Sequence, residues 1–182
     1  KYSYNNSNRT TTMTDNLNKV TQMTYDSGLN LTYTIDQDGN YTISNYILNK
    51  DNQDVIRELV SQRDKFGYVT QYLRDGSGNI TAEVYADYSK IQYFYDKYNN
   101  VIKQIDQNGN KTFYIYDANG VNLLKTIVPL NGVDEYTQSS DASKFAITTL
   151  EYYDKSTALP IGGLIKKLTR PSGAYITYVY DK

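Results

Sequence analysis

Short runs of apolar and aromatic residues alternate with polar clusters along most of this chain. Residues 101–105, 112–116 and 175–180 are such runs, and they are rich in the β-branched and aromatic side chains typical of strands. No segment has a convincing helical stripe; residues 54–60 come nearest, and they fit a strand equally well. The pattern therefore predicts an all-β fold.

The polar clusters between these runs have the composition of tight turns. Most begin with Asp, whose side chain can accept hydrogen bonds from amides ahead of it, and carry Gly or Asn three residues later, where positive φ is tolerated. We predict structural turn positions at Asp36, Gly39, Asp75, Gly78, Asp96, Asn99, Asp106, Gly109, Asp117 and Gly120.

The turns recur at a fixed spacing. Asp75, Asp96 and Asp117 follow one another at intervals of 21 residues, and Asp106 lies between the last two. One unit is then two strands and two turns, which is one hairpin added to a growing sheet. We expect repeated antiparallel β-hairpins that form a curved or spiralling sheet, in one structural domain belonging to a longer protein.

The repeat is interrupted in two places. Residues 1–127 carry hairpin repeats that diverge around 45–62, and residues 146–182 carry further repeats. Between them, residues 128–145 contain Pro, Gly and Ser and are predicted to form an inserted loop. The repeat does not explain this insertion, so a specific partner site could lie there.

Tyrosines stand in spaced pairs just before several turns. Because side chains alternate between the faces of a strand, each pair shares one face, and neighbouring hairpins would align the rings as a ladder or a binding surface. The residues concerned are Tyr93, Tyr95, Tyr114, Tyr116, Tyr178 and Tyr180.

Three consecutive segments carry a family resemblance. The sequences Tyr-Phe-Tyr-Asp-Lys-Tyr-Asn-Asn at 93–100, Asp-Gln-Asn-Gly-Asn-Lys-Thr at 106–112 and Tyr-Ile-Tyr-Asp-Ala-Asn-Gly at 114–120 resemble the RHS/YD-repeat family, and weaker copies cover most of the chain. The resemblance implies a segment of a YD-type β-shell, as in Rhs and Tc toxins, wall-associated proteins and teneurins. In the toxins such a shell encloses a C-terminal effector.

The chain departs from that family at one motif. The family's core ends with an Asp-Pro-x-Gly-type motif tied to self-cleavage, whereas none of Pro129, Pro160 and Pro171 follows Asp here. We therefore expect an open segment of a shell rather than a complete capsule.

Composition limits the chemistry. The chain has no His and no Cys, which removes Ser-His-Asp triads, cysteine nucleophiles and His/Cys zinc sites. The segments 36–40 and 106–110 do not fit an EF-hand loop, and turns account for most carboxylates that could serve a glycosidase. We expect no enzymatic activity, no cofactor and no metal.

Charge and hydropathy limit the classes of binding partner that the chain is expected to have. A net charge of −1 without a like-charge block argues against a nucleic-acid partner, and no apolar run is long enough for a membrane span. We expect the rest of the parent polypeptide as the main partner, and weak self-association through unpaired edge strands.

The leading hypothesis is a structural segment of a bacterial secreted or cell-surface protein, contributing to a β-shell or scaffold that in a toxin would enclose an effector. The alternative is an adhesin-like module that binds a glycan or a protein through the exposed tyrosine rows or the sheet edges.

Overall fold

The computed structural model describes residues 1–49, 56–130, 133, 135–154 and 163–180. Within these ranges the chain forms fifteen strands and one three-residue 3-10 helix, η1. It divides into two compact units, Lys1–Lys90 and Ile91–Lys182, which are described separately below. No helix in the described ranges is long and apolar enough to cross a membrane.

The first unit holds β1 (Tyr2–Asn5), β2 (Thr10–Thr14), β3 (Val20–Tyr25), β4 (Leu31–Ile35), β5 (Tyr41–Asn49), β6 (Ile56–Arg63), β7 (Val69–Arg74) and β8 (Ile80–Val84). The second holds β9 (Lys90–Tyr95, from its second residue), β10 (Val101–Ile105), β11 (Lys111–Tyr116), β12 (Leu123–Pro129), η1 (Ala142–Lys144), β13 (Phe145–Tyr152), β14 (Ile165–Thr169) and β15 (Tyr175–Thr177).

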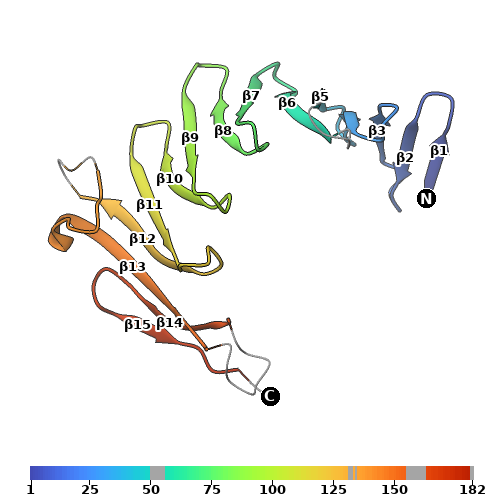
Figure 1. Cartoon of the computed structure of the whole chain (residues 1–182). Coiled ribbons are helices and arrows are strands. Elements are labelled where there is room, and N and C mark those ends of the chain that lie inside the picture. Colours follow the sequence, from blue (N-terminus) through green and yellow to red (C-terminus); the bar gives the residue numbers. More distant parts are fainter. Residues whose placement is uncertain (50–55, 131–132, 134, 155–162, 181–182) are drawn as a thin grey trace. The chain divides into compact units, whose positions relative to one another are not determined.

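The strands follow chain order in one antiparallel sheet, from β1 to β15 (Figure 1). Within each unit, an inner strand thus pairs with the strand before it and the strand after it, as expected when every connection is a hairpin. The prediction of an all-β fold built from repeated antiparallel hairpins is confirmed.

Most hairpin turns have one geometry. In the turn after β10, the amide of Gly109 donates to the carbonyl of Asp106, and the amide of Asp106 donates to the carbonyl of Asn110. Gly109 has a φ of 83°. This is a three-residue loop closed by a residue in the left-handed region, which matches the twist of the flanking strands.

From β3 onward, paired strands with a register shift are separated by pairs without one, whereas β1–β2 and β2–β3 both have a continuous register. Six of the pairs shift register, namely β3–β4, β5–β6, β7–β8, β9–β10, β11–β12 and β13–β14; the shift lies at the last residue of the first strand except in β5–β6, where it lies at Tyr46 inside β5. The extra, unopposed residue lies in the second strand each time, for example Thr32 in β4 and Leu124 in β12. A bulge bends its strand and increases the local right-handed twist, so each of these six strand pairs carries one bend.

The divergent region around 45–62 contains the two longest strands of the first unit, β5 and β6, and residues 56–60 of the segment that came nearest to a helix lie in β6. The diverged turn expected at 49–52 falls mostly outside the described residues.

The insertion is shorter than the sequence indicates. Val128 and Pro129 belong to β12 and pair with Ala146 and Phe145 of β13, so the connection begins at residue 130 and ends with η1. β12 and β13 therefore form a hairpin with a long loop. The buried apolar cluster of the second unit lies under that loop: Phe113 of β11, Ile127 of β12 and Phe145 of β13.

Candidate functional site

The turn aspartates are hydrogen-bonded through both carboxylate oxygens. Asp106 Oδ1 accepts from the amides of Asn108 (2.9 Å) and Asn110 (2.8 Å), and Asp106 Oδ2 accepts from Asn110 Nδ2 (2.9 Å). Asp36 and Asp75 make the same three contacts with the residues two and four positions ahead. The Asp side chain thereby ties together both ends of its own turn.

These contacts also fix the ionisation of the carboxyls. A hydrogen bond from the side chain of the Asn four residues ahead lowers the pKa of Asp36, Asp75 and Asp106, and backbone amides lower it further. Backbone and side-chain hydrogen bonds likewise lower the pKa of Asp117, led by the amide of Val121. A carboxylate held ionised in this way is unsuited to act as a general acid near neutral pH.

The tyrosine pairs lie on two strands separated by a third. Tyr93 and Tyr95 are in β9, Tyr114 and Tyr116 are in β11, and β10 runs between these strands. Tyr93 is opposite Gln104 of β10, and the Tyr114 hydroxyl donates to Gln104 Oε1 at 3.2 Å. The four rings are half-buried, and burial raises the pKa of Tyr116. Tyr178 and Tyr180 follow β15, at the end of the described sheet.

Several tyrosine hydroxyls bind the backbone of the preceding repeat. Tyr152 donates to the carbonyl of Leu123 (2.8 Å), Tyr180 to Ile165 (3.0 Å) and Tyr46 to Leu31 (3.2 Å). Each accepting residue is the one that pairs with the bulge-junction tyrosine of its own repeat, for example Leu123 with Tyr116. We call this contact the tyrosine latch, because it joins one repeat unit to the next.

An arginine takes the latch position once. Arg74 precedes Asp75, where other repeats have Tyr, and its guanidinium donates to the carbonyls of Gly78 (2.8 Å) and Leu59 (3.4 Å). Arg74 Nε also lies 3.9 Å from Glu58 Oε2. The sequence pattern marks Tyr152, with Tyr153, as a variant of the tyrosines that precede a turn, but it does not single out Tyr46 or Arg74. Their position within the repeat was the available signal.

The inserted loop covers one face of the second unit. The Tyr136 ring lies 5.2 Å from the ring of Phe145, edge-on, and 6.2 Å from that of Phe113. Glu135 Oε1 lies 3.1 Å from Lys111 Nζ and 3.7 Å from Lys103 Nζ. Together with Val133, which packs on the same cluster, these residues form what we call the cover.

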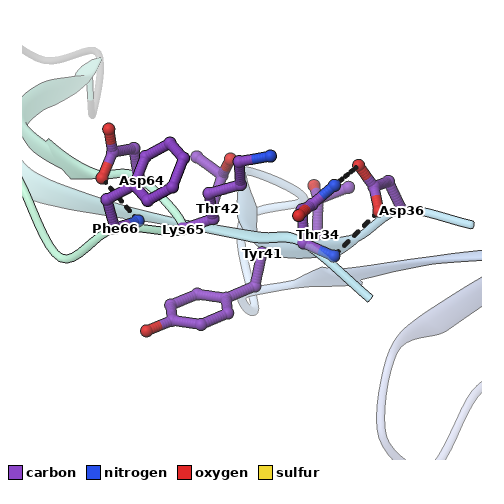
Figure 2. Close-up of a pocket in the computed structure, with 8 residues that line it drawn as sticks. Thr34, Asp36, Tyr41, Thr42, Asp64, Lys65 and Phe66 are labelled. Carbon is purple, nitrogen blue, oxygen red and sulfur yellow. Dashed lines mark hydrogen bonds between the residues drawn. The ribbon is translucent and has the colours of Figure 1, made fainter. Parts of the chain in front are cut away.

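The first unit has a hollow of about 360 Å³ between the turn that follows β4 and the turn that follows β6, shown in Figure 2. It is lined by Thr34, Asp36, Asn40, Tyr41, Thr42, Asp64, Lys65 and Phe66. Hydrogen bonds within the two turns occupy both Asp36 oxygens and one Asp64 oxygen. In Figure 2 the Tyr41 ring lies on the opposite side of the ribbon from the Phe66 ring. Lys65 Nζ lies over the Phe66 ring, 5.0 Å from its centre.

Within the described ranges, no group of three or more His, Cys, Asp or Glu side chains is arranged to hold a metal ion. The hollow offers an exposed ring, two threonines and one ammonium group. These groups could make weak polar contacts with a ligand. The residues that line the hollow do not include a nucleophile paired with a base.

Comparison with known proteins gave matches only among solved structures. No family model matches the chain, and no curated protein matches it. A Photorhabdus luminescens Tc holotoxin pore with a mutated TccC3 matches at 12% identity over 90% of this chain, with a TM-score of 0.46. A TcdB2-TccC3 complex matches at 13% identity over 90% of the chain, with a TM-score of 0.45, and a TcdB2-TccC3-Cdc42 complex at 12% over 88%, with a TM-score of 0.43.

Tc toxins are among the proteins that the sequence resemblance names. The chain spans only 10–11% of the length of these solved chains. The strand order, the turns and the bulges of this structure define its fold.

Proposed function

We propose that this chain is a non-enzymatic structural segment of a bacterial secreted or cell-surface protein, contributing to a β-shell or scaffold. One observation carries the proposal: the polar groups that recur with the repeat are used to build the sheet. The turn aspartates close their own turns, and latch tyrosines bind the carbonyls of the preceding repeat.

The repeat is also suited to extension. A repeat brings its own turns and, in most repeats, one bulge, and several repeats add a latch contact to the repeat before. Adding a repeat therefore lengthens the sheet without changing the repeats before it. The repeated bulge adds a bend in most repeats, which favours a curved wall over a flat sheet. In a toxin-type parent, such a wall would enclose an effector encoded elsewhere in the polypeptide.

Deleting one whole repeat tests this function. Removing residues 75–95 joins Arg74 to Asp96 and so restores the Arg-Asp junction of the deleted repeat. If the chain is a modular scaffold, this variant keeps its strand content by circular dichroism and unfolds cooperatively near the wild-type temperature.

The matched control deletes residues 75–84, which is half a repeat. This change removes the bulged junction of β7 and β8 and reverses the direction of every later strand. We expect loss of cooperative unfolding in this control. Equal tolerance of both deletions, or unfolding of the whole-repeat variant, would contradict the modular scaffold.

Exposed aromatic side chains favour a second candidate, a glycan- or protein-binding module. Phe66 and Tyr88 lie at turn tips of the first unit and are largely exposed, whereas Tyr93, Tyr95, Tyr114 and Tyr116 are half-buried. A glycan array tests this candidate with wild-type protein and with a Phe66→Ala, Tyr88→Ala variant. If the wild-type protein binds a glycan and the variant does not, the result supports a glycan-binding module. If no glycan on the array is bound, the glycan-binding hypothesis is wrong.

A further inference from the structure

The turn between β6 and β7 departs from the usual turn pattern at its fifth residue. Where Asn stands there, its side-chain amide donates to Oδ2 of the turn aspartate, as Asn40 does to Asp36 at 2.7 Å. The turn that begins at Asp64 has Tyr68 instead. Asp64 Oδ1 still accepts from the amides of Phe66 and Tyr68, both at 2.9 Å, but within the described ranges Asp64 Oδ2 accepts no hydrogen bond. One carboxylate oxygen is therefore available to a ligand.

The third residue of the same turn is also unusual. The turns that begin at Asp36 and Asp75 have the polar residues Asp38 and Ser77 at this position, whereas this turn has Phe66, which is 72% exposed. A single exposed aromatic residue is common on protein surfaces and does not by itself indicate a site. Here, however, the ring lines the hollow of Figure 2 together with the carboxylate of its own turn.

The other groups that line the hollow are polar and largely unused. Lys65 Nζ lies 5.0 Å from the centre of the Phe66 ring, and the side chains of Thr34 and Thr42 line the same space. In the part of the chain that the structure describes, neither threonine hydroxyl bonds to another residue, and Lys65 has no ion pair. Asp36, at the other end of the hollow in Figure 2, uses both carboxylate oxygens within its own turn. The hollow thus combines an apolar ring with one free acceptor and several free donors.

This combination of groups favours a sugar as the ligand. A pyranose has an apolar face of C–H groups, which can lie on an aromatic ring, and a rim of hydroxyls that both donate and accept hydrogen bonds. The lining carries two carboxylates and one ammonium group, so an anionic sugar is disfavoured. The volume of about 360 Å³ lies at the lower end of the range of about 300–1,000 Å³ typical of ligand pockets, which suits a single sugar unit.

We propose that the hollow beside the turn at residues 64–68 binds one neutral pyranose unit of a glycan. Phe66 stacks on the apolar face of the sugar, Asp64 Oδ2 accepts from its hydroxyls, and the ammonium group of Lys65 and the two threonine hydroxyls bind the remaining ones. This inference rests on the glycan-binding candidate above and gives it a site. It is compatible with the scaffold function, because it uses a turn tip and leaves the strand ladder and the latches unchanged.

The probes are the methyl pyranosides of glucose, galactose, mannose and N-acetylglucosamine, each titrated into the intact protein while its amide chemical shifts are recorded. We expect at least one of them to shift the amides of Thr34, Thr42 and Phe66 saturably, with a dissociation constant of about 1 mM, because one exposed hollow contacts few ligand groups. Asp64→Asn keeps an acceptor for the turn amides but replaces the free oxygen by an NH2 group. Phe66→Ala removes the ring. Each change should weaken binding by about tenfold or more, and Phe66→Tyr should keep it.

Two substitutions of Tyr68 separate the free oxygen from the ring beside it. Tyr68→Asn restores the side-chain amide of the other turns, which would occupy Asp64 Oδ2. Tyr68→Ala removes a ring that does not line the hollow and supplies no amide. Tyr68→Asn should therefore lose binding while keeping or raising the melting temperature, whereas Tyr68→Ala should bind like the wild type. Leu17→Ala is the matched control, since Leu17 holds the same turn position as Phe66 and is 71% exposed, but is not aromatic; it should leave binding unchanged.

Three results would overturn the inference: no saturable shift around the hollow with any of the four glycosides, wild-type affinity of Asp64→Asn or Phe66→Ala, or equal affinity of the two Tyr68 variants. If a glycan on the array still bound the protein in that case, the proposed site would be wrong while the glycan-binding candidate stood. The scaffold function is tested separately by the whole-repeat deletion.

Discussion

Ile35 in β4 and Ile127 in β12 occupy the same position of the repeat, four residues after the aliphatic residue that faces the junction tyrosine. Ile35 is half-buried, whereas Ile127 is 0% exposed. The two units differ in the same sense: among the described residues, the buried apolar side chains are Ala82 in the first unit and Phe113, Ile127 and Phe145 in the second.

The cover explains this difference. A single sheet leaves both faces in contact with water, and a buried core requires a second layer packed on one of them. In the second unit, Val133 and Tyr136 supply a small patch of that layer. The same hairpin repeat can therefore be held together either by turns, ladder and latches alone, or with additional apolar burial wherever a segment folds over it.

Truncation of the two isoleucines should give the largest difference between the two units. Ile127→Ala should destabilise the second unit by about 3–4 kcal/mol, because the deleted groups leave a cavity in a closed cluster. Ile35→Ala should cost about 1 kcal/mol, since its site remains open to water. Urea unfolding followed by amide exchange in β4 and β12 measures both. Equal losses would show that the cover does not close a core.

How far the sequence predicts this architecture depends on the distance over which each contact acts. The Asp and the Gly or Asn of a turn lie within four residues of each other, so turn positions and strand alternation can be read from local chemistry. Leu29 and Tyr88 also have positive φ, at 64° and 65°, although neither residue type favours it. There the sheet sets the backbone conformation against local preference.

Two glycines of the second unit have the same backbone conformation but different surroundings, so their substitution by alanine should destabilise the protein to different extents. Gly109 and Gly120 have φ values of 83° and 69°. A Cβ at Gly109 would meet open space, whereas one at Gly120 would lie 2.4 Å from Cδ2 of Tyr98. We expect Gly109→Ala to cost about 1 kcal/mol and Gly120→Ala about 2–3 kcal/mol, from backbone strain plus displacement of the ring.

Thermal unfolding of the two variants measures this difference, and a Tyr98→Ala background isolates its cause. Removing the ring should reduce the loss at Gly120 to that at Gly109, after correction for the Tyr98→Ala change itself. If the gap persisted, contact between neighbouring turns would not be its source.

The cover and the latches show what sequence reasoning could not supply. Tyr46 is followed by Ile47 rather than Asp, so no Tyr-Asp motif marks it as a latch. Glu135 and Tyr136 stand in a segment without periodicity, and their contacts with Lys111 and Phe113 lie more than twenty residues back in the chain. Periodicity places strands and faces, but it does not indicate which irregular segment folds onto a face.

In the first unit, Leu29 offers a stabilising substitution. It lies at the turn position that Gly120 fills in the second unit, with a φ of 64° and a side chain that is 72% exposed. Leu29→Gly should stabilise by about 0.5–1 kcal/mol, because relief of left-handed strain outweighs the extra freedom of unfolded glycine. Leu17 is the control: it is 71% exposed but lacks a positive φ, so Leu17→Gly should destabilise. Melting temperatures that shift in the same direction would contradict this explanation.

The smallest effect tests the polar half of the cover. Glu135→Gln keeps the shape of the side chain but weakens its contacts with Lys111 and Lys103. Because Glu135 is 58% exposed, solvent screening limits the expected loss to about 0.5 kcal/mol at neutral pH. Asp38→Asn in the first unit is the control, since the Asp38–Lys19 pair is highly exposed and covers no core; it should change stability by less.

The pH dependence of this loss follows from the direction of the pKa shift. The hydrogen bond from Lys111, together with the nearby charge of Lys103, lowers the pKa of Glu135 in the folded chain. The stabilisation is therefore fully present above the unfolded pKa of about 4.3 and disappears as pH falls through the lowered folded value. Wild type and Glu135→Gln should differ in urea midpoint at pH 7 and converge at strongly acidic pH. A difference that stayed constant down to acidic pH would assign the effect to packing of the side chain, and the cover would then hold its face through Val133 and Tyr136 alone.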